Sequence, residues 1–137
     1  MPKLENIFLI VSAAVLVAVG SALSFAPDVL YHGSGAGLPD MTLLRSDLRS
    51  GGALLLLIGL YAFWSALFAQ ELRPALGLSA LTYLGYGLGR LVSIGFDGPA
   101  TGTLLTIIVL EWILGLIALV FAMRCGAVQL NHQATVA

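Results

Sequence analysis

The sequence predicts an all-α integral membrane protein, a four-helix bundle whose helices run alternately up and down. Its composition is the first reason, because 59% of the 137 residues are hydrophobic and only 9% are charged. A soluble domain has about 45 to 50% apolar and about 25% charged residues. The second reason is that the apolar residues form four long runs, separated by the prolines at positions 27, 39, 74 and 99. The length favours one membrane domain over residues 1–137.

The first run, Leu4 to Phe25, is long enough to be a transmembrane helix. At about 1.5 Å per residue it spans the hydrocarbon core of about 30 Å, whereas the apolar part of a cleavable signal peptide has about 7 to 15 residues. Pro27 follows the small-residue site Ser24 to Ala26, which makes cleavage there unfavourable. We therefore expect a helix over 4–25. A stripe of small residues on it would allow a neighbouring helix to approach closely: Ala14, Ala18 and Ala22.

The segment from Asp28 to Asp40 is expected to be an exposed loop. Its glycine-rich tract, Gly33 to Gly37, lacks the preceding strand and the Gly-Lys-Ser/Thr ending of a phosphate-binding loop. His32 could share a metal ion with Asp28 or Asp40, but one histidine and two loop carboxylates form a weak ligand set. We therefore predict no metal site.

The second helix is expected over 41–69, with Asp40 as its N-cap. Arg45 and Arg49 lie together at i and i+4, and the sequence is wholly apolar from Gly51 to Ala69. This helix would enter the membrane just after Arg49. Considered alone, the two arginines read as side chains that extend to the lipid head groups. The alternative is that they belong to a polar site.

The third helix is expected over 75–96, with Pro74 in its first turn, where the missing amide costs nothing. Gly85 and Gly89 form a GxxxG motif, which in an apolar helix indicates close helix contact, within the bundle or in a homodimer. Packing within the bundle is the expected use. A nearby face carries three residues at helical spacing: Tyr83, Tyr86 and Arg90.

The fourth helix is expected over 100–123, after a turn at Asp97-Gly98-Pro99 and before a frayed tail over 125–137. Four crossings would place both termini on one side, together with Lys3, Arg73 and Arg124. Arg45 and Arg49 would face the other side. If those two arginines belong to a polar site, the positive-inside rule places both termini in the cytoplasm.

Arg90 and Glu111 are opposite charges inside apolar helices, where each costs about 2.5 to 3.5 kcal/mol on insertion scales. They lie about 9 Å and about 16 Å from the outer ends of their helices. Their side chains lean toward each other because the helices run in opposite directions. This geometry permits a direct pair, with Tyr83 or Tyr86 donating a hydrogen bond to the carboxylate, while the sequence leaves open which face of its helix each side chain occupies. Such a pair either fixes helix packing or, with Arg49 and Asp97, lines a pocket for a ligand head group or a proton.

The polar positions and the glycines beside them resemble a family of short bacterial four-helix membrane proteins, domain of unknown function 4345. The resemblance covers roughly Pro27 to Val120. It implies a four-helix bundle in the bacterial inner membrane, and it supplies no activity. The residues that carry it are Arg49 followed by Gly51-Gly52, Gly89-Arg90, Asp97-Gly98-Pro99 and Glu111. It implies that Arg49, Arg90, Asp97 and Glu111 form the characteristic polar set.

Three functions remain open, and the first is the expected one. It is the non-enzymatic binding of a lipid or of a hydrophobic or anionic small molecule, or service as an accessory subunit of a membrane complex. The second is an enzyme acting on a lipid-like substrate, with Glu111 as acid or base. The third is an oligomeric transporter or channel subunit that assembles through Gly85 and Gly89.

Several classes of partner are not indicated by the sequence. No cofactor motif accompanies Glu111, so no cofactor is expected. A net charge of −1 gives no basic surface for nucleic acid. The single cysteine, Cys125, can form neither an internal disulfide nor a zinc site of familiar spacing. Membrane lipids, a membrane-protein partner and a second copy of the chain remain as expected partners.

Overall fold

The computed structural model describes residues 4–33, 37–68, 72–99 and 102–136, with side chains up to Cys125. The regular elements of this part are all helices. They are α1 (Leu4–Phe25), α2 (Pro27–Gly33), α3 (Thr42–Leu67), α4 (Leu72–Asp97) and α5 (Gly102–Val136).

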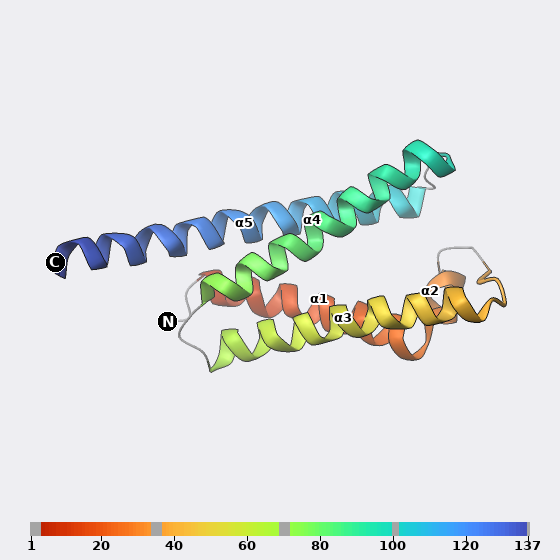
Figure 1. Ribbon diagram of the computed structural model, residues 1–137, viewed down its shortest axis with the longest axis horizontal. Helices are drawn as coiled ribbons and strands as arrows, with labels where there is room; N and C mark the ends of the chain where they lie inside the picture. Colours follow the sequence, from red (N-terminus) through yellow and green to blue (C-terminus); the bar gives the residue numbers. More distant parts are fainter. Residues whose placement is uncertain (1–3, 34–36, 69–71, 100–101, 137) are drawn as a thin grey trace.

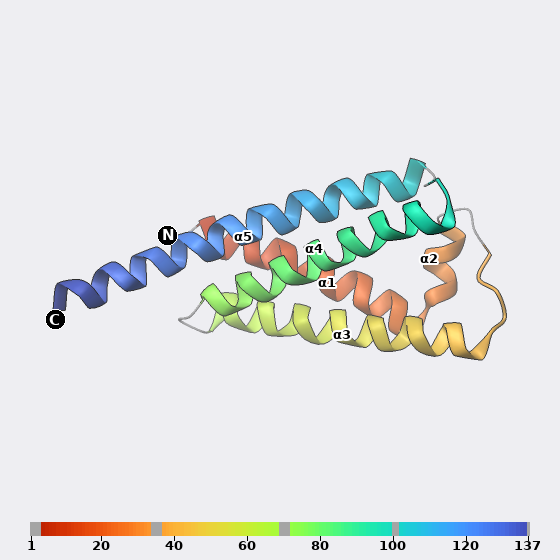
Figure 2. The ribbon, with the colours of Figure 1, turned by 45° about the horizontal axis from the view of Figure 1, so that its top comes forward.

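The long helices lie roughly along one axis and run in alternate directions (Figures 1 and 2). α1 packs along α3, and α4 packs along α5, so the molecule consists of two helix pairs, an α1–α3 pair and an α4–α5 pair. The short α2 follows α1 at the right-hand end of both views. α1 begins and α5 ends at the opposite end of the molecule.

Three helical segments in the described part are long and apolar enough to cross a membrane: α1, α3, and Gly102–Cys125 of α5. α4 is as long as α3, at 26 residues, but it is not one of these three segments. Its glycines, its two tyrosines and Arg90 make it less apolar than the others. Large apolar side chains such as Leu57, Leu81 and Val109 face outward. These features define a small helical membrane protein.

Glycines set the close contact within the α1–α3 pair. A Cβ atom added to Gly52 would come within 2.6 Å of Leu23 Cβ, and one added to Gly59 within 2.9 Å of the Val17 backbone nitrogen. Gly20 is equally close to the backbone of α3. The alanine stripe expected to serve this purpose does not, because Ala14 and Ala18 are exposed.

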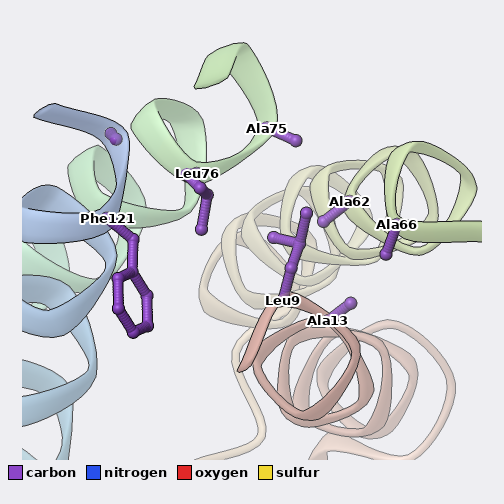
Figure 3. Packing of buried hydrophobic residues seen from close by; sticks show 8 residues of the cluster. Leu9, Ala13, Ala62, Ala66, Ala75, Leu76 and Phe121 are labelled. Atoms are coloured by element: carbon purple, nitrogen blue, oxygen red, sulfur yellow. The ribbon is translucent and has the colours of Figure 1, made fainter. Parts of the chain in front are cut away.

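All four long helices contribute to the buried apolar cluster shown in Figure 3. The side chains are mostly small, which brings the backbones close together. Phe121 is the largest of them and meets Phe8 edge-on, with 5.3 Å between the ring centroids. The cluster consists of Leu9, Ala13, Ala62, Ala66, Ala75, Leu76, Phe121 and Ala122.

The segment after α1 differs from the expected loop, because Pro27–Gly33 is helical. Pro27 occupies its first position, where a proline is tolerated. Residues 34–36 of the glycine tract lie outside the described part.

Helix ends also differ from the expected ones. Asp40 is not the N-cap of the next helix, since α3 begins at Thr42 and its capping residue, Met41, makes no side-chain cap bond. The last helix continues past Met123 to Val136, because the residues beyond include no proline to interrupt it.

Gly85 and Gly89 do not pack within the chain as expected. A Cβ atom added to either would meet nothing within 4 Å. The close contact between α4 and α5 instead involves Gly87, where an added Cβ atom would lie 2.9 Å from Nε1 of Trp112. Gly87 is two residues from each motif glycine, which is about 200° around the helix. The motif therefore faces away from α5.

Candidate functional site

Arg90 of α4 and Glu111 of α5 form an ion pair. The Arg90 Nε atom donates to both carboxylate oxygens, Oε1 and Oε2, at 3.0 Å each. The Arg90 side chain is 33% exposed and the Glu111 side chain 13% exposed. The carboxylate is thus mostly enclosed, while the guanidinium is partly open to its surroundings.

Two glycines bring the helices together around this pair. Gly87 precedes Arg90 by one turn and lies against Trp112, while Gly115 follows Glu111 by one turn. A Cβ atom added to Gly115 would come within 2.7 Å of Leu84 Cγ. Because α4 and α5 run in opposite directions, side chains that lean toward their own N-termini converge. This geometry places the Arg90 guanidinium against Glu111.

The carboxylate uses only one of the three nitrogens of the guanidinium. In the part of the chain that the structure describes, no hydrogen bond from the two terminal nitrogens of Arg90 is recorded. A guanidinium presents its five N–H donors as a planar fork that matches a carboxylate or phosphate. Arg90 therefore keeps donors for a second anion while Glu111 holds it in place.

The tyrosines do not donate to Glu111 as expected. The Tyr83 hydroxyl donates to the backbone carbonyl of Ser12 in α1 at 2.8 Å. The Tyr86 hydroxyl lies beside Gly51 of α3, 3.4 Å from where a Cβ atom on that glycine would be. Both tyrosines connect α4 to the other helix pair.

The remaining members of the expected polar set lie elsewhere. Arg45 pairs with Asp28 of α2 at 2.8 Å and approaches Asp40 at 3.5 Å. Asp97 is exposed and accepts a hydrogen bond of 2.7 Å from Ser93 in its own helix. The expected pocket that would unite them with Arg90 is therefore not formed by direct contacts.

Arg49 is also separated from Arg90. It lies two residues before Gly51, about 200° around α3 from the face that meets Tyr86. Its backbone carbonyl instead accepts a long hydrogen bond, 3.5 Å, from the Ser24 hydroxyl of α1. The Arg49 side chain is exposed.

The contact between Asp28 and Arg45 was missed at the level of sequence. The hydrogen bond from Arg45 lowers the pKa of the Asp28 carboxyl below its ordinary value. A proline followed by an acidic residue is a helix-start signal, and it could have identified α2 at Pro27. The pairing of its aspartate with Arg45 depends on tertiary structure. The pair fastens α2 to the beginning of α3.

Two buried serines were missed as well. Ser12 of α1 and Ser79 of α4 are 0% exposed, and their hydroxyl oxygens have no hydrogen-bond partner among the residues that the structure describes. Tyr83 follows Ser79 by one turn of α4 and bonds to the backbone of Ser12. The two helix pairs thus meet at hydroxyl groups as well as at apolar side chains.

Among the described residues, no three His, Cys, Asp or Glu side chains gather as they would around a metal ion.

The fold and this pair define a small helical membrane protein with an arginine–glutamate pair between two of its helices. The chain belongs to the family described as a domain of unknown function (DUF4345), which it matches over residues 4–122. The match includes both Arg90 and Glu111. No curated protein and no solved structure matches the chain.

Proposed function

We propose that the protein is a four-helix bundle of the bacterial inner membrane, in which α1, α3, α4 and α5 all cross the bilayer. The equal lengths of α3 and α4 and the alternating helix directions support four crossings. The sequence assigns three cationic residues to the side of the termini, Lys3, Arg73 and Arg124, against Arg45 and Arg49 on the other side, and this excess of one supports a cytoplasmic location for both termini. In this arrangement the ion pair between Arg90 and Glu111 lies within the membrane.

We further propose that the bundle binds, without catalysis, a lipid or another hydrophobic small molecule with an anionic head. The observation that carries this proposal is that Glu111 contacts one of the three guanidinium nitrogens of Arg90. Glu111 accepts only from Nε, so the terminal nitrogens remain for the head group. An arginine and an anion form charge-assisted hydrogen bonds about twice as strong as neutral ones. Glu111 is then a positioning residue that orients the guanidinium.

The proposal is tested by native mass spectrometry of the protein purified gently from its own membrane. Wild type is compared with Arg90→Ala, Glu111→Gln and a control, Arg49→Ala, which removes an exposed arginine outside the pair. We expect one class of small molecule to leave with wild type and the control and to be lost from Arg90→Ala. If a correctly folded Arg90→Ala retains the same molecule in the same amount, the binding proposal is wrong.

A second function, an oligomeric subunit of a transporter, channel or larger complex, is favoured by one observation. Gly85 and Gly89 face open space, where a helix of another chain could approach closely. The test is disulfide cross-linking of Gly85→Cys in a Cys125→Ser background. A cross-linked dimer that Gly89→Leu abolishes would support this function. A monomer in both detergent and lipid would contradict it.

A further inference from the structure

A groove between α4 and α5 lies far from the ion pair. It has a volume of about 450 Å³, within the range of about 300 to 1,000 Å³ for small-molecule sites. It is formed by the beginning of α4 and the second half of α5. Arg73, at its edge, precedes Arg90 by about 25 Å of helix. The lining residues are Arg73, Pro74, Gly77, Leu119, Ala122 and Met123.

The floor of the groove is apolar because the helices present short or hydrophobic side chains there. Gly77 opens it, since a Cβ atom at this position would meet nothing within 4 Å. Leu119 and Met123 lie one turn apart on α5 and are both exposed along the groove. This surface suits a hydrocarbon chain better than a polar ligand.

The described charge at the groove is positive. Of the described residues that line it, Arg73 is the only charged one; it is exposed and makes no ion pair with another described residue. Arg124 follows Met123 directly and is likewise exposed. An apolar groove with a cation at its edge is complementary to a molecule with a hydrocarbon chain and an anionic head.

We propose that this groove binds an anionic phospholipid, with an acyl chain along Gly77 and Leu119 and the phosphate at Arg73. The site is separate from Arg90 and does not depend on what Arg90 binds. In the orientation proposed above, it faces the cytoplasmic leaflet, whose anionic lipids attract basic side chains.

The experiment uses the full chain in nanodiscs of equal parts phosphatidylglycerol and phosphatidylcholine, followed by native mass spectrometry of the released protein. Wild type is expected to retain phosphatidylglycerol in preference to phosphatidylcholine. Arg73→Gln should lower the apparent affinity for phosphatidylglycerol about fivefold, the effect of one basic residue near a membrane surface. Gly77→Leu, which fills the groove, should reduce it by more than about tenfold.

Matched controls separate the groove from general effects. Gly85→Leu adds the same side chain to the same helix at another open position, and Arg49→Gln removes an exposed arginine elsewhere. Both should retain phosphatidylglycerol like wild type. Arg73→Gln should lower retention by the same factor in an Arg90→Gln background as in wild type, which separates this site from the one proposed above. Circular dichroism verifies that each variant is folded. If Gly77→Leu fails to fold, the head-group preference of Arg73→Gln decides.

Three results would overturn the proposal. One is equal retention of the two lipids by wild type. Another is wild-type retention of phosphatidylglycerol by folded Arg73→Gln or Gly77→Leu. The third is a photo-cross-linker at Leu119 that captures a protein instead of a lipid in native membranes, because the groove would then be a protein interface.

Discussion

The hydroxyl of Tyr83 in α4 donates a hydrogen bond of 2.8 Å to the backbone carbonyl of Ser12 in α1. Both residues are buried, and the bond joins the α1–α3 pair to the α4–α5 pair. Tyr83 follows Leu76 by two turns on α4, and Leu76 belongs to the apolar cluster that all four long helices share. The contact between the two pairs therefore combines small apolar side chains with a buried polar bond.

Tyr83→Phe should lower the free energy of unfolding by about 1 kcal/mol, the usual net contribution of one hydrogen bond. The ring would still fill its space, so the loss would come from the hydroxyl alone. The measurement is equilibrium unfolding by dodecyl sulfate in mixed micelles. Tyr61→Phe, which removes a hydroxyl from an exposed ring, serves as the control. Equal stability of the two variants would show that the bond contributes nothing.

Gly52→Ala should destabilise the protein by about 1 to 3 kcal/mol, because the added methyl group would overlap Leu23 and the backbone of Ser24. Gly89→Ala makes the same change on an open face of α4. There the better helix propensity of alanine should stabilise the chain, by up to about 1 kcal/mol. The same unfolding measurement compares them. A Gly89→Ala variant as damaged as Gly52→Ala would mean that the open face is covered, as in an oligomer.

These glycines show where prediction from sequence stops. A helix that is apolar on all sides has no polar face to indicate which way it is turned. Gly85 and Gly89 form a recognisable motif, yet Gly87, between them, makes the contact with α5. Composition and run length sufficed to predict the four long helices, though neither α2 nor their exact ends, and the rotation of each helix depends on side chains from other parts of the chain.

The sequence permitted the ion pair without fixing it, because depth along two helices can be counted whereas the rotation of each helix cannot. Depth along the helix and the lean of the side chains bring Arg90 and Glu111 to the same level. In the structure the Nε atom of Arg90 lies 3.0 Å from Oε1 of Glu111. The partner of Arg45 was harder to predict, because α2 changes which groups are near it. Once Pro27–Gly33 is helical, Asp28 is positioned to pair with Arg45.

Glu111→Leu should destabilise the protein more than the double change Arg90→Leu with Glu111→Leu. The single change leaves Arg90 without a counter-ion, which costs about 3 to 5 kcal/mol for a fully buried charge. We expect about 3 kcal/mol here, because a third of the Arg90 side chain is exposed. The double variant should recover most of that loss, since two apolar side chains pack well between helices.

The double variant also separates structure from function. If the pair binds a ligand, this variant should be folded yet lack the small molecule that leaves with wild type in native mass spectrometry. If it is as unstable as Glu111→Leu, the loss comes from packing and not from an unpaired arginine.

The ion pair that holds α2 against α3 should depend on pH. The hydrogen bond from Arg45 holds the pKa of Asp28 below its ordinary value of 3.8. The unfolded segment therefore takes up a proton at higher pH than the folded one. The contribution of the pair is complete above the ordinary pKa and is lost as the pH falls through the lowered one. We expect α2 to remain attached at neutral pH and to loosen only below about pH 4.

Limited digestion with pepsin can follow this loosening, because the protease works in acid and α2 contains Leu30 and Tyr31 as cleavable residues. Wild type should resist cleavage in α2 near pH 4 and become susceptible as the pH falls. Asp28→Asn should be cleaved readily throughout, because it removes the charge at every pH. Asp40→Asn is the control, since Asp40 is fully exposed and lies farther from Arg45, at 3.5 Å against 2.8 Å. A similar pH profile for wild type and Asp28→Asn would show that another contact holds α2.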